Sequence, residues 1–277
     1  MPVGIEILLP NGDPNGLKIV TISGWNGKAF LVPRAKINEL KGRDEAQHPA
    51  LYFLFGEGED ASRPKVYIGE SESFYQRISS HDAGKDFWSE ALIFTGTINR
   101  AHVKYLENQS IRLAKEVNRS EILNVVEPAE NRLTEFEKAG ANMYFDKVKL
   151  VLGLFGMSLF QELPKKSESR KVYYFTTENA HSIGTLLETG EFLVFEGSTA
   201  RVYEAPSFAG RGGSQHRSRL AQEGVLSRVG DESYVFTRDY IFHTPSAAGD
   251  AVAGRSVNGW TVWKDDVGTT LDDNVRK

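Results

Sequence analysis

The stretch Lys65-Val-Tyr-Ile-Gly-Glu-Ser-Glu-Ser-Phe-Tyr-Gln-Arg-Ile-Ser-Ser-His81 joins a β-rich run to the start of a helix. Residues 65–69 are typical of a strand, and a helix is expected over 73–81, where Ser73 and Gln76 fit a capping box. A partner strand is expected at 50–55 and a third strand at 91–95, with the polar loop 56–64 closing the first pair. These signals predict a mixed α+β fold.

Two tyrosines occupy the expected hairpin. The midpoint between Tyr52 and Tyr67 falls at Glu59 and Asp60, inside the polar loop. If the hairpin closes symmetrically there, the two tyrosines are cross-strand neighbours on one face of the sheet. Paired tyrosines are also frequent in ordinary sheets, so the pairing alone leaves a purely structural role open.

Two more polar residues share one face of the helix that follows. Arg77 lies one turn into this helix and His81 four residues later, while Phe74 and Ile78 can face the core. Arg77 could be a solvated helix arginine. His81 could be a surface or hydrogen-bonded histidine, because metal or acid–base roles need a second partner.

A carboxylate has an unusual position on the next helix, expected over 101–117. At about 100° per residue the apolar side chains form one broad arc, and Glu107 falls inside it between Ile111 and Ala114. An unpaired carboxylate there would be costly, so Glu107 needs a cation. That cation could be Arg77 in a structural ion pair, or a divalent ion held by one carboxylate and waters, as suits magnesium.

The order of these residues resembles that of the GIY-YIG endonuclease domain. The resemblance covers about residues 48–126, with Ala50 where the family name has its first glycine, and Asn118 could compete for the last position. It implies a nuclease with a small central antiparallel sheet flanked by helices. The matching positions are Leu51-Tyr52, Tyr67-Ile68-Gly69, Arg77, His81, Glu107 and Asn124.

The resemblance also implies a mechanism, in which a DNA phosphodiester is hydrolysed with one Mg²⁺ or Mn²⁺ ion held by Glu107. Arg77 would bind the scissile phosphate, and Tyr67 would act as general base, with Tyr52 hydrogen-bonded nearby. His81 belongs to the same expected catalytic set. Asn124 would hold the phosphate side of the site or the Glu107 end of its helix. A non-cleaving nucleic-acid-binding or regulatory protein on the same fold is the alternative, and a purely structural or protein-binding module is a third interpretation.

Turn signals divide the 277 residues into segments. We expect an N-terminal β-hairpin element at 1–46, in which Asn26-Gly27 joins two β-rich runs. The nuclease-like domain follows, then a helical bridge and linker, a C-terminal α+β domain and a polar, frayed tail. Their expected bounds are 47–130, 131–171, 172–264 and 265–277, with the linker itself at 164–171.

The C-terminal segment resembles a domain of unknown function that often follows such nuclease domains. The resemblance rests on 194–201, 236–240, 245–248 and 254–264, where Trp260 and Trp263 are expected in the core. A further group of basic residues lies between Ser207 and Gln222, a stretch without acids, and could contact phosphates or simply be solvated. These residues are Arg211, His216, Arg217 and Arg219.

The composition excludes some classes of protein. The chain has no cysteine, so disulfides and thiolate metal sites are excluded and a cytoplasmic protein is expected. The formal net charge is −4, so binding of DNA, the expected partner, must depend on local sites. The N-terminus lacks the pattern of a signal peptide, and the longest apolar run, 150–160, is far shorter than the ~20 residues of a membrane span. The oligomeric state stays open.

Overall fold

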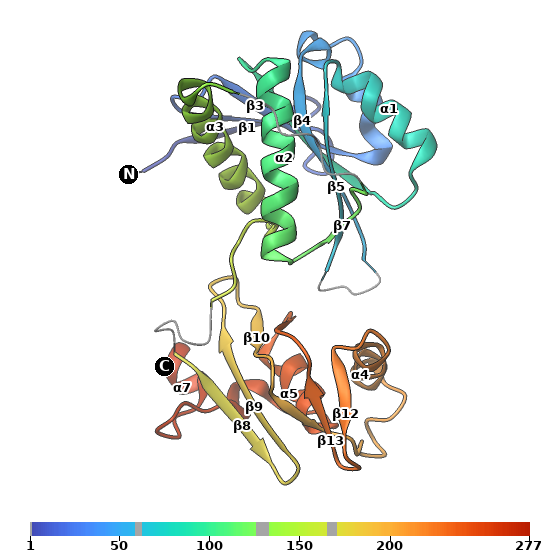
Figure 1. Cartoon of the computed structure of the whole chain (residues 1–277), viewed down its shortest axis with the longest axis vertical. Helices are drawn as coiled ribbons and strands as arrows, with labels where there is room; N and C mark the ends of the chain where they lie inside the picture. Colours follow the sequence, from blue (N-terminus) through green and yellow to red (C-terminus); the bar gives the residue numbers. More distant parts are fainter. Residues whose placement is uncertain (1, 59–62, 126–132, 165–170) are drawn as a thin grey trace. The chain divides into compact units, whose positions relative to one another are not determined.

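The computed structural model describes residues 2–58, 63–125, 133–164 and 171–277. It divides the chain into two compact units, Met1–Leu163 and Pro164–Lys277 (Figure 1). Both units combine helices and strands, so the mixed α+β class is confirmed. None of the described helices combines the length and hydropathy that a membrane span requires.

The first unit is built on one seven-stranded sheet with the order β1-β2-β3-β6-β4-β5-β7. Neighbouring strands are antiparallel, except that β5 and β7 are parallel. Because β3 pairs with β6, residues 1–46 belong to the same sheet as the nuclease-like segment. The strands are β1 (Ile5–Leu8), β2 (Lys18–Ile22), β3 (Gly27–Pro33), β4 (Ala50–Gly56), β5 (Lys65–Ser71), β6 (Glu90–Gly96) and β7 (Glu121–Ile122).

Helices cover both faces of this sheet, which explains why β4 is an almost continuous apolar run. Leu51 and Phe53 point into the core beneath α2 and α3, whereas Tyr52 and Leu54 point into the core beneath α1. The helices are two 3₁₀ helices (Arg34–Leu40 and Asp44–Gln47), α1 (Phe74–Gly84), α2 (Arg100–Val117) and α3 (Glu135–Leu154).

The helix α3 belongs to the first unit. It begins with a capping box between Thr134 and Glu137, and its inner side chains, among them Phe145 and Val148, pack into the core over the sheet. The expectation of a bridging helix over 131–163 is therefore corrected, since α3 ends at Leu154 and buries its apolar face against its own unit. The expected linker lies mostly outside the described residues, which omit 165–170.

Ser73 is the N-cap of α1, as expected, but the capping box with Gln76 is wrong. The Ser73 hydroxyl donates to the carbonyl oxygen of Ala46 at 3.2 Å and to the side-chain oxygen of Gln47 at 3.3 Å. These acceptors lie more than twenty residues earlier in the chain, so the local sequence pattern could not reveal them.

The second unit contains a four-stranded sheet, β14-β10-β9-β8, and a three-stranded sheet, β11-β13-β12. The expected start of α5 is confirmed, with Thr244 as N-cap, Pro245 in the first turn and Gly254 in the left-handed conformation after the helix. The strands are β8 (Tyr173–Thr177), β9 (Ala180–Leu186), β10 (Phe192–Val194), β11 (Thr199–Arg201), β12 (Leu226–Val229), β13 (Ser233–Phe236) and β14 (Tyr240–Phe242). The helices are α4 (Gly212–Gln222), α5 (Pro245–Ala253), α6 (Gly259–Val262) and α7 (Leu271–Val275).

The expectation of a frayed tail at 265–277 is wrong. Leu271 is fully buried in the core of the second unit, next to the fully buried Trp263. Asp265 accepts hydrogen bonds from the Asn274 side chain and the Thr269 backbone, and these bonds, with the nearby Lys171 ammonium, lower the pKa of its carboxyl to about 2. The polar composition of this segment therefore reflects side chains that hold a turn and a short helix onto the domain.

Candidate active site

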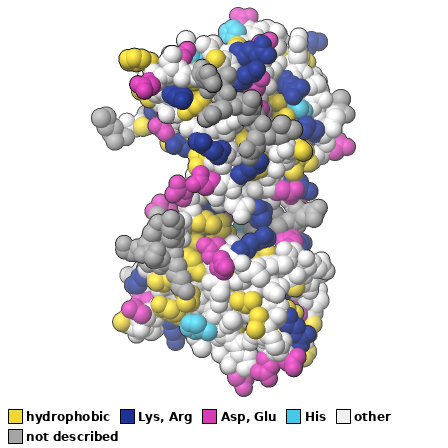
Figure 2. All heavy atoms as spheres, viewed as in Figure 1, with side chains coloured by type: hydrophobic (Ala, Val, Ile, Leu, Met, Phe, Trp, Pro, Cys, Tyr) yellow, Lys and Arg dark blue, Asp and Glu magenta, His cyan; other side chains and the backbone are white. Residues whose placement is uncertain are grey.

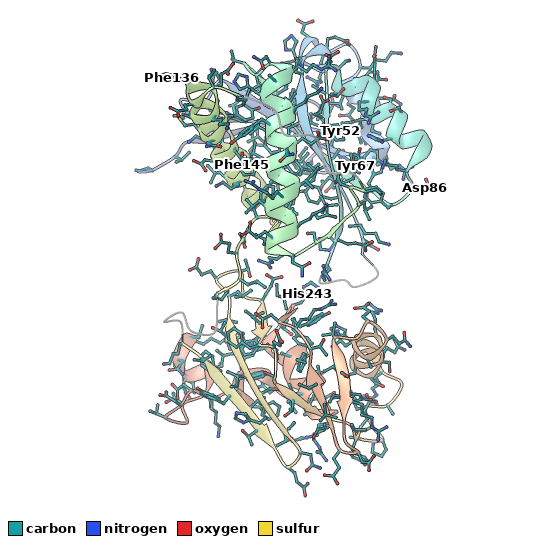
Figure 3. The ribbon with its side chains drawn as sticks, in the orientation of Figure 1. Tyr52, Tyr67, Asp86, Phe136, Phe145 and His243 are labelled. Carbon is teal, nitrogen blue, oxygen red and sulfur yellow. The ribbon has the colours of Figure 1, made fainter. Side chains whose placement is uncertain are left out.

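The two tyrosines lie on one face of the sheet but not directly opposite each other. Tyr52 pairs with Gly69, and Tyr67 pairs with Leu54, so the tyrosines are diagonal neighbours with ring centroids 6.3 Å apart (Figure 3). The expected shared face is correct and the expected register is wrong by two residues. The loop midpoint on which that register depended lies outside the described residues.

Gly69 provides the space that the Tyr52 ring occupies. A β-carbon added at Gly69 would lie 2.3 Å from the Tyr52 hydroxyl oxygen, far inside van der Waals contact. The close approach comes from the direct pairing of these two residues across β4 and β5. The Gly69 position therefore fixes where the Tyr52 hydroxyl can lie.

Three polar side chains meet at that hydroxyl. The Arg77 Nε–H donates to the Tyr52 oxygen at 3.4 Å, and the same oxygen lies 2.8 Å from His81 Nε2. Burial, together with the positive charges of Arg77 and Lys85, lowers the pKa of His81 to about 4. Burial raises the pKa of Tyr52 above its ordinary value. Tyr52 therefore stays a phenol and His81 a neutral imidazole, joined by a hydrogen bond between the Tyr52 hydroxyl and His81 Nε2, while the same hydroxyl oxygen accepts from Arg77.

Tyr67 lies beside this group and is less buried than Tyr52. Its ring centroid is 5.2 Å from that of His81, and the Lys85 ammonium lies 3.8 Å from the Tyr67 ring centroid. Burial and the charge of Arg77 lower the pKa of Lys85.

Glu107 approaches from the other face of the sheet. Glu107 is carried by α2 and lies near Glu70. Side chains alternate along a strand, so Glu70 is on the same side of β5 as Ile68. Burial and the negative charge of Glu70 raise the pKa of Glu107. A hydrogen bond from the Glu70 backbone N–H and the charges of Arg77 and Lys104 lower it, and the net pKa is about 7. An ion pair between Glu107 and Arg77 is not formed in the described part of the chain, where Arg77 bonds to Tyr52 instead.

Asn124 completes the edge of the sheet. Its side-chain amide donates to the Ile68 carbonyl oxygen at 2.7 Å, and its side-chain oxygen accepts the Ile68 N–H at 3.0 Å. The side chain thus continues the pairing of β5 beyond the two residues of β7. Asn118, the competing asparagine, ends α2 in the left-handed conformation and accepts a hydrogen bond from Arg63.

Glu107 and the neighbouring Glu70 are the carboxylates at this site that could hold a metal ion. No cluster of three or more His, Cys, Asp or Glu side chains that could hold a metal ion occurs among the described residues. Mg²⁺ keeps several waters and often needs only one or two carboxylates together with substrate phosphates. Glu107 is desolvated and repelled by Glu70, and a bound cation would offset both penalties.

The basic group of the second unit divides in two. Arg217 is 4% exposed and bonds to the Glu204 carboxylate at 3.0 Å and to the carbonyl oxygens of Arg201 and Ala251. His216 is half-buried against Tyr240. These contacts argue against the phosphate role expected for Arg217, whose acidic partner lies just outside the stretch considered.

Arg211 and Arg219, the other members of that group, are exposed on or next to α4. Figure 2 shows Lys and Arg side chains interspersed with Asp and Glu over the visible face of each unit. Any attraction for a polyanion on this face is therefore local, as the net charge of −4 already indicated.

Two residues of the candidate site were missed from the sequence. Lys85 follows Arg77 and His81 at four-residue intervals, a spacing that places all three on one helical face and could have revealed it. Glu70 lies three residues after Tyr67, and only the strand alternation indicates that it faces α2 rather than the tyrosines.

Comparison with known proteins concerns mainly the second unit. Residues 173–275 match a family described as a domain of unknown function, DUF4357. The match extends from the start of β8 to the end of α7 and so includes the segment expected to be a tail. No curated protein and no solved structure matches the chain.

Proposed function

We propose that the first unit is a metal-dependent endonuclease of the GIY-YIG type, which hydrolyses phosphodiester bonds of DNA. The observation that carries the proposal is the contact group of Tyr52, Arg77 and His81 beside Tyr67, with the Glu107 carboxyl on the neighbouring helix. These are the positions at which the sequence resembles that family. A half-buried carboxyl of raised pKa that senses the charge of a held arginine is the kind of group that clusters at active sites.

The chemistry assigned to each residue follows from its surroundings. Arg77 remains a guanidinium because its bond to Tyr52 raises its pKa, and its other nitrogen atoms can bind a phosphate. Tyr67 is the general base, since it is the more accessible tyrosine and Lys85 lies over its ring. Tyr52 and His81 position Arg77 and take no proton from water.

The edge of β5 is where these groups converge. Tyr67 and Arg77 lie on the α1 side of β5 and Glu107 on the α2 side, so a phosphodiester that crosses the part of β5 beyond its two residues paired with β7 would meet both. Glu107 would hold a Mg²⁺ or Mn²⁺ ion, with Glu70 nearby. Such an ion stabilises negative charge on the phosphate and on the leaving oxygen.

The test is cleavage of supercoiled plasmid, single-stranded DNA and branched DNA with Mg²⁺ or Mn²⁺. We expect Glu107→Gln to reduce cutting by a factor of about 100 or more, because the variant loses charge stabilisation of the transition state. Glu116→Gln, an exposed site on the same helix, is the matched control and should cut like the native protein.

No cutting of any of these DNAs by the native protein would contradict the proposal, as would equal cutting by Glu107→Gln. Metal-independent DNA binding that is equal in both proteins, without cutting, would favour the non-cleaving binding protein.

A further inference from the structure

The outer face of α3 carries a stripe of exposed apolar side chains. Phe136, Met143, Leu150 and Leu154 are 92%, 72%, 38% and 44% exposed. At about 100° per residue they lie within about 40° of one another around the helix, with Gly140 and Lys147 filling the turns between them. This four- and three-residue alternation is the spacing with which one helix packs along another.

The opposite side of α3 already has its partners. Tyr144, Phe145 and Val148 pack into the core of the first unit, and the Tyr144 hydroxyl donates to the Thr95 carbonyl oxygen at 2.9 Å. Figure 3 shows Phe145 on the side of α3 toward α2 and Phe136 on its outer side. The apolar stripe is therefore additional to what the fold of this unit requires, and contiguous exposed apolar surface marks interaction sites.

A hollow lies beside the stripe, between α3 and the turn that joins β2 to β3. Its volume is about 300 Å³, and its lining includes Trp25, Ile98, Gly140, Met143 and Tyr144. Asn26, Thr97, His102 and Lys147 also line the hollow, so it offers both apolar and polar contacts, and its aromatic and apolar members can receive a large apolar side chain. Phe136 is such a side chain, and it projects from the same helix.

The positions of this side chain and this hollow are related by symmetry about Gly140. Phe136 lies four residues before Gly140, while Met143 and Tyr144 lie three and four residues after it. If a second α3 packs antiparallel with its own Gly140 opposite, each Phe136 reaches the hollow of the other copy. Such a two-fold contact uses the same surface on both subunits.

Gly140 suits the crossing point of the two helices. No atom lies within 4 Å of a β-carbon added there, so the position is open to a partner. The absence of a side chain lets two helix backbones approach closely. A larger residue would hold the helices apart and withdraw Phe136 from the facing hollow.

The charges along α3 also favour the antiparallel arrangement. Residues 135–138 carry two acidic side chains and one basic, whereas residues 146–149 carry one acidic and two basic. In an antiparallel pair that crosses at Gly140, residues 135–138 face residues 142–145, so the acidic start of each helix lies within one turn of the basic stretch of the other. A parallel pair would place like charges together.

We propose that the outer face of α3 is the contact surface between two copies of this chain, with Phe136 of each copy in the α3 hollow of the other. The proposal is independent of the nuclease function, since none of its residues belongs to the candidate active site.

The test is the mass of the full chain in solution, measured by light scattering over a wide range of protein concentration. We expect twice the chain mass of 30.9 kDa. Phe136→Asp should give the monomer with an unchanged circular dichroism spectrum, because the native side chain is almost fully exposed. Val267→Asp, at a site 80% exposed in the second unit, is the matched control and should leave the dimer intact.

A cysteine variant tests the geometry of the contact. The chain has no cysteine, so Gly140→Cys can crosslink only to its own copy. A disulfide needs Cα atoms about 5.5 Å apart, which the proposed crossing allows and few other arrangements would. Oxidation should convert Gly140→Cys to a covalent dimer and leave Ser218→Cys, an exposed site on α4, as single chains.

A native protein that stays monomeric at every concentration would overturn the proposal, whether α3 is then bare or covered by another part of the chain. A dimer that survives Phe136→Asp, together with the absence of the Gly140→Cys crosslink, would place the contact elsewhere and overturn it too.

Discussion

The missing side chain of Gly69 sets the geometry of the candidate active site, because the Tyr52 ring lies where a β-carbon would be. Tyr52 in turn receives Arg77 and contacts His81. The contact between Gly69 and the Tyr52 ring therefore helps to position the Arg77 guanidinium, which Gly69 does not itself bind. This steric role needs no left-handed backbone, since Gly69 has none.

Gly69→Ala should lower the free energy of unfolding by about 1–3 kcal/mol, because the added methyl group must displace a fully buried ring. Urea unfolding measures this loss. Gly153→Ala, in α3, is the control, because no atom lies within 4 Å of a β-carbon added there. This substitution should stabilise the protein by up to about 1 kcal/mol. Equal effects of the two substitutions would show that Tyr52 moves aside without cost.

The raised pKa of Glu107 gives a defined pH dependence. Between its ordinary value of 4.5 and about 7, the folded protein keeps a proton on Glu107 that the unfolded chain has released. The free energy of unfolding therefore falls as the pH rises through this window. Glu107→Gln removes the effect, so its stability relative to the native protein should rise by about 1–3 kcal/mol from pH 4.5 to pH 8.

Urea unfolding of both proteins across this range is the measurement. The pKa of His81, lowered from 6.5 to about 4, has the opposite effect, because it lowers the free energy of unfolding as the pH falls below 6.5. His81 is present in both proteins, so this contribution cancels in their difference. Addition of Mg²⁺ at pH 8 should stabilise the native protein and not the variant. A stability difference that does not change with pH would show that Glu107 titrates like an ordinary carboxyl.

At the scale of elements, the side chain of Asn124, two residues after β7, makes the hydrogen bonds to β5 that a further strand residue would make. Asn124→Ala removes both of its hydrogen bonds to Ile68 and leaves a partly buried backbone N–H and carbonyl without these partners. We expect a loss of about 1–3 kcal/mol and faster hydrogen exchange of the Ile68 amide. Asn142→Ala, which removes only exposed side-chain bonds to Tyr105 and Gln109, should change stability by about 0.5 kcal/mol or less. Unchanged exchange at Ile68 in Asn124→Ala would contradict this role.

Elements were predicted well where a local pattern determines them. The expected 101–117 helix and the 50–55 and 91–95 strands lie within a residue or two of α2, β4 and β6, because the apolar arc of the helix and the short apolar runs of the buried strands are visible in the local sequence. The register of the hairpin and the bonds of Ser73 were wrong, because each depends on parts of the chain distant in sequence or on the closure of a loop. The packing of residues 265–277 onto the second unit was not predicted, because Leu271 is the one apolar side chain that this polar segment contributes to the buried core cluster.

The same distinction applies to the site across the whole molecule. The structure brings Tyr52, Tyr67, Arg77 and His81 together, as their order along the chain indicated. It does not form the ion pair of Glu107 with Arg77, and it buries Arg217 through a carboxylate and two carbonyl groups from other segments. Spacing within one helix predicts which side chains share a face, but only tertiary packing decides which of them stay accessible.

The two units should fold separately, because each core is drawn from one unit alone. The buried members of the first unit's clusters extend from Leu17 to Leu159, and those of the second unit lie within 173–271. Fragments 1–163 and 164–277 should each unfold cooperatively in urea, with native near-ultraviolet circular dichroism.

A shorter fragment, 1–130, lacks α3 and with it Tyr144, Phe145 and Val148, so we expect it to lose tertiary packing and bind a hydrophobic dye. Cooperative folding of 1–130 would show that α3 is an addition to the nuclease-like sheet, whereas failure of 1–163 to fold would show that its stability depends on the second unit. The fragment 1–163 should also retain DNA cleavage, since every residue assigned to the proposed chemistry lies within it.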